Sequence, residues 1–263
     1  MLFKFMRLLY VIIFVMLSTF AYAQNASDDV YSPDEFEARL NQVKEFKDMG
    51  LYNSAIEVLD DMISHTNNDI LKSNLYVQII MALSILGEND KIIERFQQIT
   101  NDGTLSNIED NQVLSGIYLG YAAALENKKL YQEAIAAREK EIFYCTKGDK
   151  NEQAAIAYMG LASDYRNLNQ KWQAINCYDK SISIMMQILN VTNDDIRKEH
   201  VKDIKLELAF NKKSECFFAL NNMTEANYNL ALAIACGGES SSAAKNILDM
   251  QGLNYKEILK NHP

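Results

Sequence analysis

The sequence is poor in residues that interrupt helices. Only two Pro and ten Gly occur among 263 residues, and there is a single Trp. Few chain breakers, together with 11 Met, favour helices over a loop-rich fold. A hydrophobic content of 48% supplies ample core material and excludes wholesale disorder. The chain is long enough for one large or two medium domains.

The sequence also lacks the short motifs of common catalytic and cofactor sites. No HExxH, GxSxG, Walker-type or GxGxxG pattern occurs, and His65, His200 and His262 lie far apart. His200 belongs to DDIRKEHVKD, a mixed-charge segment that we interpret as a solvated helix face. Carboxylates are plentiful, but no pair stands out as a matched acid and base. We therefore predict a protein that is not an enzyme and has no cofactor, metal or catalytic site.

Basic residues are scarce relative to acidic ones. The chain has 26 Lys and Arg against 35 Asp and Glu, a formal net charge of −9. This balance disfavours nucleic acid or an anionic membrane surface as a partner, and it supports solubility.

The longest apolar run lies at the N-terminus. Lys4 and Arg7 come first, LLYVIIFVMLSTF follows, and then Ala21-Tyr22-Ala23 precedes Gln24. This order is typical of a secretory signal peptide cleaved after Ala23. An uncleaved membrane anchor is the alternative, but the run is shorter than the roughly 20 residues of a spanning helix. We predict a signal peptide at residues 1–23, an exported mature chain, periplasmic or secreted, and no later membrane-spanning segment.

Cysteine is scarce, and its positions are Cys145, Cys177, Cys216 and Cys236. An even number in an oxidising compartment permits disulfides. All four, however, lie in helical patterns beside apolar residues, and none has CxxC spacing. We favour buried small hydrophobic side chains over a pair of bridges, and the sequence leaves both open.

A recurring helical pattern is what the sequence does have. LYNSAI at residues 51–56 returns as LYQEAI at residues 130–135, and the best-formed copy is YMGLASDYRNLNQKWQAINCYDK from residue 158. Its bulky residues recur three and four apart, on one face of each of two helices. Ala162 and Ala174 are small enough to let the two helices approach. The pattern resembles the tetratricopeptide repeat (TPR), W-x2-L-G-x2-Y…A-x3-F.

Four further copies fit the same register. The anchor positions in the second helices are Ala55, Ile92, Ala134, Ala174 and Ala226, separated by 37, 42, 40 and 52 residues. These spacings exceed the 34 residues of the family's unit, so helices or loops are lengthened. The resemblance implies an all-α, right-handed superhelical solenoid of about five hairpins at residues 33–238. A short lead at 24–32 precedes it, and capping helices at 239–263 follow. An unrelated antiparallel helical array is the alternative.

Local signals predict several helix ends. Residues 32–35, SPDE, form a capping box with Pro at the first helical position, and SNIE at residues 106–109 matches a second box. Gly87, Gly148 and the Gly pair at 237–238 lie where helices should end.

The resemblance also implies a binding function. In the TPR family, the first helices of successive hairpins line a concave groove that binds peptides or protein segments. In the register of the repeat, the resemblance assigns the groove-facing, partner-binding positions to the following residues: Lys44, Lys47, Met81, Ser84, Glu126, Asn127, Met159, Arg166, Asn167, Asn211, Glu215 and Phe218. The Lys/Asn/Arg clamp of the chaperone-binding members is not matched, because most of its positions are apolar here.

Two functions follow from this resemblance. The first is an exported module for protein–protein interaction with an unidentified protein or peptide. The alternative is a periplasmic sensory or accessory component of an envelope signalling system, acting through a separate membrane partner. Self-association through the ends of the solenoid is a further binding variant.

We predict that the mature protein begins at Gln24, because the small-x-small site ends at Ala23. N-terminal sequencing of the native protein from a cell-envelope fraction checks this. A native chain that still starts at Met1 would contradict both the cleavage and the export.

Overall fold

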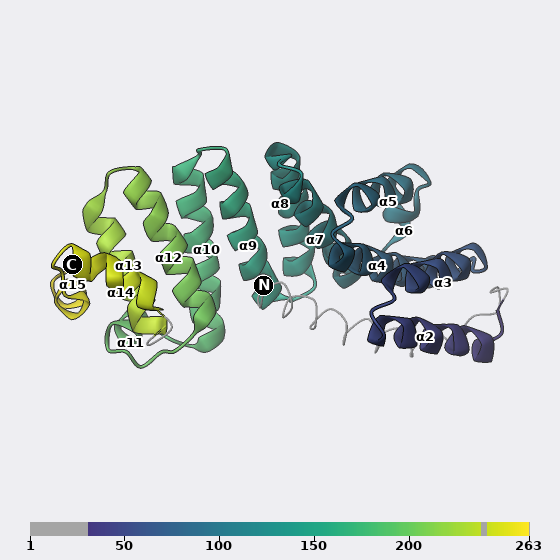
Figure 1. Cartoon of the computed structure of the whole chain (residues 1–263), viewed down its shortest axis with the longest axis horizontal. Coiled ribbons are helices and arrows are strands. Elements are labelled where there is room, and N and C mark those ends of the chain that lie inside the picture. The colour runs from purple at the N-terminus through teal and green to yellow at the C-terminus, as the bar shows by residue number, and fades with distance from the viewer. Residues whose placement is uncertain (1–30, 238–240, 263) are drawn as a thin grey trace. The chain divides into compact units, whose positions relative to one another are not determined.

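A computed structural model describes residues 31–237 and 241–262, in which fourteen helices and no strand occur (Figure 1). The prediction of an all-α chain is therefore confirmed for this part of the chain. The predicted signal peptide lies outside the described residues.

The long helices are α2 (Pro33–Asp48), α3 (Tyr52–Ser64), α4 (Asp69–Leu86), α5 (Asn89–Asn101), α7 (Asn111–Asn127), α8 (Tyr131–Lys147), α9 (Asn151–Asn167), α10 (Lys171–Leu189), α12 (Ile204–Ala219) and α13 (Met223–Gly237). Shorter helices are α6 (Thr104–Asn107), α11 (Asn193–Arg197), α14 (Ser242–Met250) and α15 (Tyr255–Asn261).

The chain divides into two compact units between Glu133 and Ala134, inside α8. We call the part up to Glu133 unit 1 and the part from Ala134 unit 2, and each is described by itself.

The turn inside each helical pair has the same geometry. One residue in each adopts a positive φ: Gly50, Gly87, Lys129, Asn169 and Asn221, with φ from 57° to 75°. The N–H of the next residue donates to a carbonyl five positions back, as from Gln170 to Tyr165 at 2.8 Å and from Asn222 to Phe217 at 2.9 Å. This bond defines a Schellman motif, which ends the first helix. Each of these residues with a positive φ lies five positions before an anchor. The turn geometry therefore recurs in the register that the sequence predicts.

The anchors themselves are buried. Ala55, Ala134, Ala174 and Ala226 are 0% exposed, and Ile92 is 1% exposed. Each lies in the first turn of its second helix, where the two helices of a pair are closest to their shared turn. The four alanines allow close contact at these points, as the spacing predicts, whereas Ile92 puts a larger buried side chain in the corresponding position.

In unit 1, α4 is the central helix: α3, α5 and α7 all pack against it. Gly120 on α7 faces α4 so closely that a Cβ there would lie 2.2 Å from the Ile80 Cγ2 atom. Phe96 on α5 stacks on Tyr121 of α7 with ring centroids 3.7 Å apart. Unit 1 is thus held by a close helix–helix approach and an aromatic stack.

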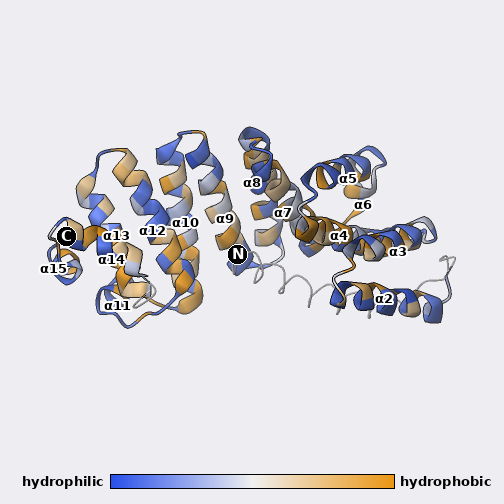
Figure 2. Ribbon diagram, viewed as in Figure 1, coloured by the Kyte–Doolittle hydropathy of each residue, from blue (hydrophilic) through white to orange (hydrophobic). Residues whose placement is uncertain are grey.

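The apolar character of α4 corrects one expectation. Residues 69–86 are long and apolar enough to cross a membrane by length and composition, contrary to the prediction that no later segment would be. Figure 2 shows α4 largely in the hydrophobic colour. However, 61% of that stretch is buried inside the protein. Burial on several sides explains the composition, since a helix that is apolar all round is usually a core helix.

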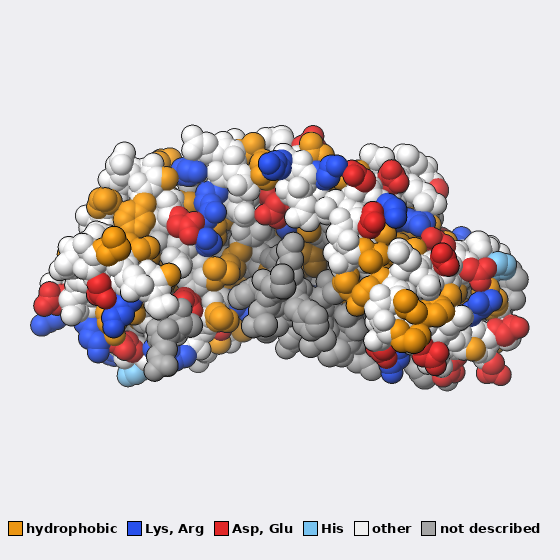
Figure 3. All heavy atoms as spheres, in the orientation of Figure 1, with side chains coloured by type: hydrophobic (Ala, Val, Ile, Leu, Met, Phe, Trp, Pro, Cys, Tyr) orange, Lys and Arg blue, Asp and Glu red, His pale blue; other side chains and the backbone are white. Residues whose placement is uncertain are grey.

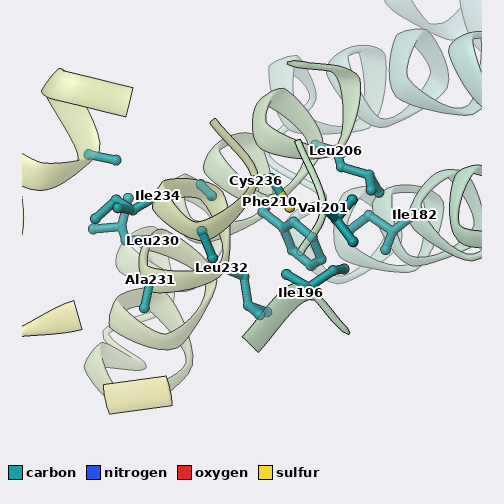
Figure 4. Packing of buried hydrophobic residues seen from close by; sticks show 14 of the residues in the cluster. Ile182, Ile196, Val201, Leu206, Phe210, Leu230, Ala231, Leu232, Ile234 and Cys236 are labelled. Carbon is teal, nitrogen blue, oxygen red and sulfur yellow. The ribbon is translucent and has the colours of Figure 1, made fainter. Parts of the chain in front are cut away.

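In unit 2, two clusters of buried apolar side chains form the core. One joins α8, α9, α10 and the end of α12 around Leu161, Ala174 and Phe217. The other joins α10, α12 and α13 around Phe210 and Leu232 (Figure 4). Leu248 of α14 and Leu259 of α15 extend this second cluster. The predicted C-terminal cap is therefore present, because α14 and α15 both pack on α13.

Two local predictions about helix ends differ in outcome. The capping box at Ser32 and Glu35 is confirmed, with the Ser32 hydroxyl accepting from the Glu35 N–H. The box at residues 106–109 is wrong, because Ser106 lies inside the short α6 and donates to the Gly103 carbonyl. Asp110 caps α7 instead, accepting from the N–H groups of Gln112 and Val113.

The segment DDIRKEHVKD is not the solvated helix face that its charges predict. Only Asn193–Arg197 is helical, and Ile196 and Val201 are buried in the second cluster. The Arg197 guanidinium donates to the Tyr228 hydroxyl at 2.8 Å. The charged residues therefore cover an apolar strip that packs onto α13.

All four cysteines are buried, and none of them forms a disulfide bond. Burial raises the pKa of the Cys177 thiol to about 11 and that of Cys236 to about 12, because the charged thiolate loses its hydration.

Ala174→Leu should destabilise the chain by about 1–3 kcal/mol, because the larger side chain has no room in the first cluster of unit 2. Ala136→Leu, at an exposed position of α8, is the matched control and should change stability by less than about 0.5 kcal/mol. Urea unfolding followed by circular dichroism measures both. Equal stability of the two variants would contradict the register.

Candidate functional site

The sequence-predicted groove residues divide between the two units. The unit 1 set is Lys44, Lys47, Met81, Ser84, Glu126 and Asn127, and the unit 2 set is Met159, Arg166, Asn167, Asn211, Glu215 and Phe218. All of them lie on first helices of the pairs, namely α2, α4, α7, α9 and α12. We call these surfaces the first-helix faces.

An ion pair joins the two first helices of the unit 2 face. Arg166 on α9 donates from Nη1 to Glu215 Oε2 on α12 at 2.7 Å. Lys212, one turn before Glu215, donates to its other oxygen at 2.7 Å. The Arg166 side chain is 26% exposed and that of Glu215 is 43% exposed. The pair is thus accessible to a partner.

Apolar side chains lie on the same two helices. Met159 on α9 and Phe218 on α12 are half-buried, and each packs against both core clusters of unit 2. Asn211 on α12 is also half-buried, while Asn167 at the end of α9 is exposed. The unit 2 face therefore combines apolar surface, a charged pair and amide groups.

The unit 1 face is built differently, because one of its lysines holds two helices together. Lys47 on α2 donates from Nζ to Gln78 Oε1 on α4 at 2.7 Å. Burial lowers the pKa of Lys47 to about 8, since a buried ammonium loses hydration. Lys44, one turn earlier, is exposed. Lys47 is therefore a structural contact, and Lys44 is the lysine that a ligand can reach.

The remaining unit 1 residues are dispersed. The Ser84 hydroxyl donates to the Ile80 carbonyl of its own helix at 2.8 Å. Asn127 donates to Asn89 Oδ1 on α5 at 2.9 Å, at the turn end of the helices. Met81 and Glu126 are half-buried. The predicted residues thus form a more continuous face in unit 2 than in unit 1.

A buried ion cluster in unit 2 was not expected from the sequence. Arg138 on α8 is 0% exposed and donates to Glu141 Oε2 at 2.8 Å, and its Nε lies 3.9 Å from Asp164 Oδ2 on α9. Gly160 makes room for it, because a Cβ there would lie 2.8 Å from the guanidinium carbon. Because the cluster is fully buried, no substrate can reach it. Its contact between Arg138 and Asp164 ties α8 to α9.

The described part of the chain contains no group of three or more His, Cys, Asp or Glu side chains placed to hold a metal ion. On the face drawn in Figure 3, basic and acidic side chains alternate over the described surface, with apolar patches between them. A mixed surface of this kind suits contact with proteins better than contact with a polyanion.

Solved structures of several repeat proteins share the fold of this chain. MamA (41 to its end) from Desulfovibrio magneticus RS-1 is 16% identical, with a TM-score of 0.56 over 79% of this chain and 95% of that chain. BtubC (BKLC) from P. vanneervenii is 12% identical, with a TM-score of 0.58 over 83% of this chain and 82% of that chain. A kinesin light chain of Podosopora anserina with nearly identical TPR-like repeats is 14% identical, with a TM-score of 0.58 over 76% and 94%.

These likenesses show the fold: the chain is a solenoid of TPR-like helical hairpins. No protein-family model matches the sequence, and no curated protein matches it either.

The lowered pKa of Lys47 predicts a pH effect. Below pH 8 both states hold the proton, and the folded chain bears the full cost of burying it. Between about pH 8 and 10.5 the folded chain has lost the proton while the unfolded chain keeps it, so the penalty for burying Lys47 falls and stability increases as the pH rises. Between pH 7 and 10, the free energy of unfolding of the parent chain should rise by more than about 1 kcal/mol relative to that of Lys47→Met.

Urea unfolding of both chains across this pH range measures the difference, and the tyrosines and cysteines common to both cancel. Lys44→Met is the matched control, on the same helix but exposed, and should show no such trend. A Lys47 difference that stays constant with pH would contradict the burial of its ammonium group.

Proposed function

We propose that the mature chain is an exported, non-enzymatic interaction module that binds a peptide or protein segment through its first-helix faces. The observation that carries the proposal is the unit 2 face, where Met159 and Phe218 leave apolar surface on the helices joined by Arg166 and Glu215. Apolar contacts supply binding energy, and a charged pair fixes orientation. The TPR-type fold supports this function, because it presents successive first helices along a common surface.

Arg166 is the residue best suited to hold a partner. A guanidinium carries five N–H donors in a planar fork, so Arg166 can keep its bond to Glu215 and still donate to a partner's carbonyl or carboxylate. Arginine and large apolar side chains also dominate the energy of protein interfaces. Phe218 provides the adjoining apolar contact.

Export forms part of the proposal and rests on residues 1–23, whose basic, apolar and small-x-small parts follow the order of a signal peptide. After cleavage, the proposed partner is a protein or peptide in the periplasm or outside the cell. The proposal needs no cofactor, nucleic acid or membrane insertion, and the acidic net charge agrees with it.

The double variant Arg166→Ala/Phe218→Ala should lose binding by more than about tenfold, since each such truncation in an interface costs about 1–4 kcal/mol. The matched control is Lys140→Ala/Phe143→Ala, a cation and a phenylalanine that are both exposed on α8. Mature chains immobilised at equal density are incubated with envelope extract, and the captured proteins are quantified by mass spectrometry.

Proteins captured by the parent and the control, but not by the double variant, support the proposal. Circular dichroism and thermal melting establish that the double variant is folded. A folded double variant that captures the same proteins as the parent would show that the binding surface does not include Arg166 and Phe218.

A further inference from the structure

A pocket of about 560 Å³ lies in unit 2 between the second helices α10 and α13, and it contains no residue of the first-helix faces. Its apolar lining is Ile182, Met186, Val191, Phe210 and Leu232. On α12, Phe210 and Lys213 belong to the pocket, while Asn211 and Glu215 project from a different side of the same helix. Polar and charged side chains make up the rest of the lining, and a concavity of several hundred Å³ with both kinds of side chain can hold a small ligand.

The pocket occurs where the repeat departs most from its usual spacing. The last interval between anchors is 52 residues, against 37 to 42 elsewhere, because residues 190–203 are inserted between α10 and α12. Residues 190–193 of this insert form one wall of the pocket. A simple repeat would have no such wall.

The insert is held firmly in place. Ile196 and Val201 are buried with Phe210 in the second cluster of unit 2 (Figure 4). The Asp203 N–H donates to the Cys236 carbonyl at 3.2 Å, and Arg197 donates to the Tyr228 hydroxyl. The wall is therefore a preformed part of the fold, as a binding site requires.

Hydrogen-bond acceptors are concentrated on the α13 side. Glu225 and Asn229 line the pocket one helical turn apart, so both project from the same face of α13. Asn229 is 1% exposed, and its Nδ2 donates to the Glu225 carbonyl at 2.8 Å. Its Oδ1 accepts no hydrogen bond from any described residue. This oxygen is closed to solvent, so the partly exposed Glu225 carboxylate is the acceptor that a ligand in the pocket reaches.

The charged side chains of the lining also favour a ligand with a positive charge. Lys213 Nζ lies 2.7 Å from Asp179 Oδ1, so these two opposite charges offset each other. The Glu225 carboxylate has its Oε1 3.3 Å from His262 Nε2, and its side chain is 37% exposed, so it can also accept from a ligand. The α13 side of the pocket is therefore suited to positive charge.

We propose that this pocket binds a small amphipathic amine. The ammonium group donates to the Glu225 carboxylate, while the apolar body lies against Ile182, Phe210 and Leu232. An apolar carboxylate would place its charge beside Glu225 and be rejected. The site is independent of the proposed peptide-binding faces.

Three probes with one carbon skeleton test the chemistry: phenylbutylamine, phenylbutanol and phenylbutanoate. Titrations of the ¹⁵N-labelled mature chain near neutral pH, followed by NMR, give each affinity and the residues whose signals move. The amine should bind at least about tenfold more tightly than the carboxylate, with the alcohol between them. Signals of α10, α13 and residues 190–193 should shift.

Glu225→Gln keeps the shape of the side chain and removes its charge, so it should abolish the preference for the amine over the alcohol. Glu139→Gln, an exposed carboxylate on α8, is the matched control and should bind as the parent does. Ser183→Trp, at an exposed position of the lining, should block all three probes.

The proposal is overturned if the amine and the carboxylate bind equally, if no probe saturates below about 10 mM, or if Ser183→Trp binds the amine like the parent. Loss of peptide capture by the first-helix faces says nothing about amine binding in the pocket. The two proposals can therefore be contradicted independently.

Discussion

A left-handed residue followed five positions later by a buried anchor is the constraint on which this architecture depends. The left-handed residue reverses the chain, and the bond from the next N–H to the carbonyl five positions back ends the first helix at a fixed point. The anchor then lets the second helix approach. Contacts such as the ion pair of Arg166 and Glu215 join neighbouring pairs, so they exist only if each pair turns in this way.

The spacing of bulky and small residues was enough to predict the helical pairs, because the anchors are buried for a reason that is local to each pair. The turn residues were less readable. Glycine, lysine and asparagine all occupy the left-handed position, and Lys129 gives no sign of it in the sequence. Helix caps were predicted only where the motif is complete, as at Ser32. Asp110 was missed because the nearby SNIE matched a capping box more closely.

Side chains that depend on distant partners could not be predicted. The run AAREKE in α8 looks like an exposed, charged helix face, yet Arg138 and Glu141 are buried. The reason lies in α9, where Gly160 leaves space and Asp164 faces the guanidinium. Lys47 is similar: the register placed it on the first-helix face, but only α4 reveals that Gln78 receives its ammonium group. The pocket beside residues 190–193 arises in the same way, from an insert whose packing partners are far along the chain.

If the chain is exported as proposed, its buried thiols make the rate of folding important. Disulfide exchange proceeds through the thiolate, and burial raises the pKa of Cys177 and Cys236 so far that the folded chain offers almost none at neutral pH. An unfolded chain in an oxidising compartment has no such protection. Oxidation and helix packing would then compete for the same four sulfurs, and any bridge formed first would hold the helices away from their cores. For an exported chain, the speed with which the helices pack would decide how much of it reaches the native state.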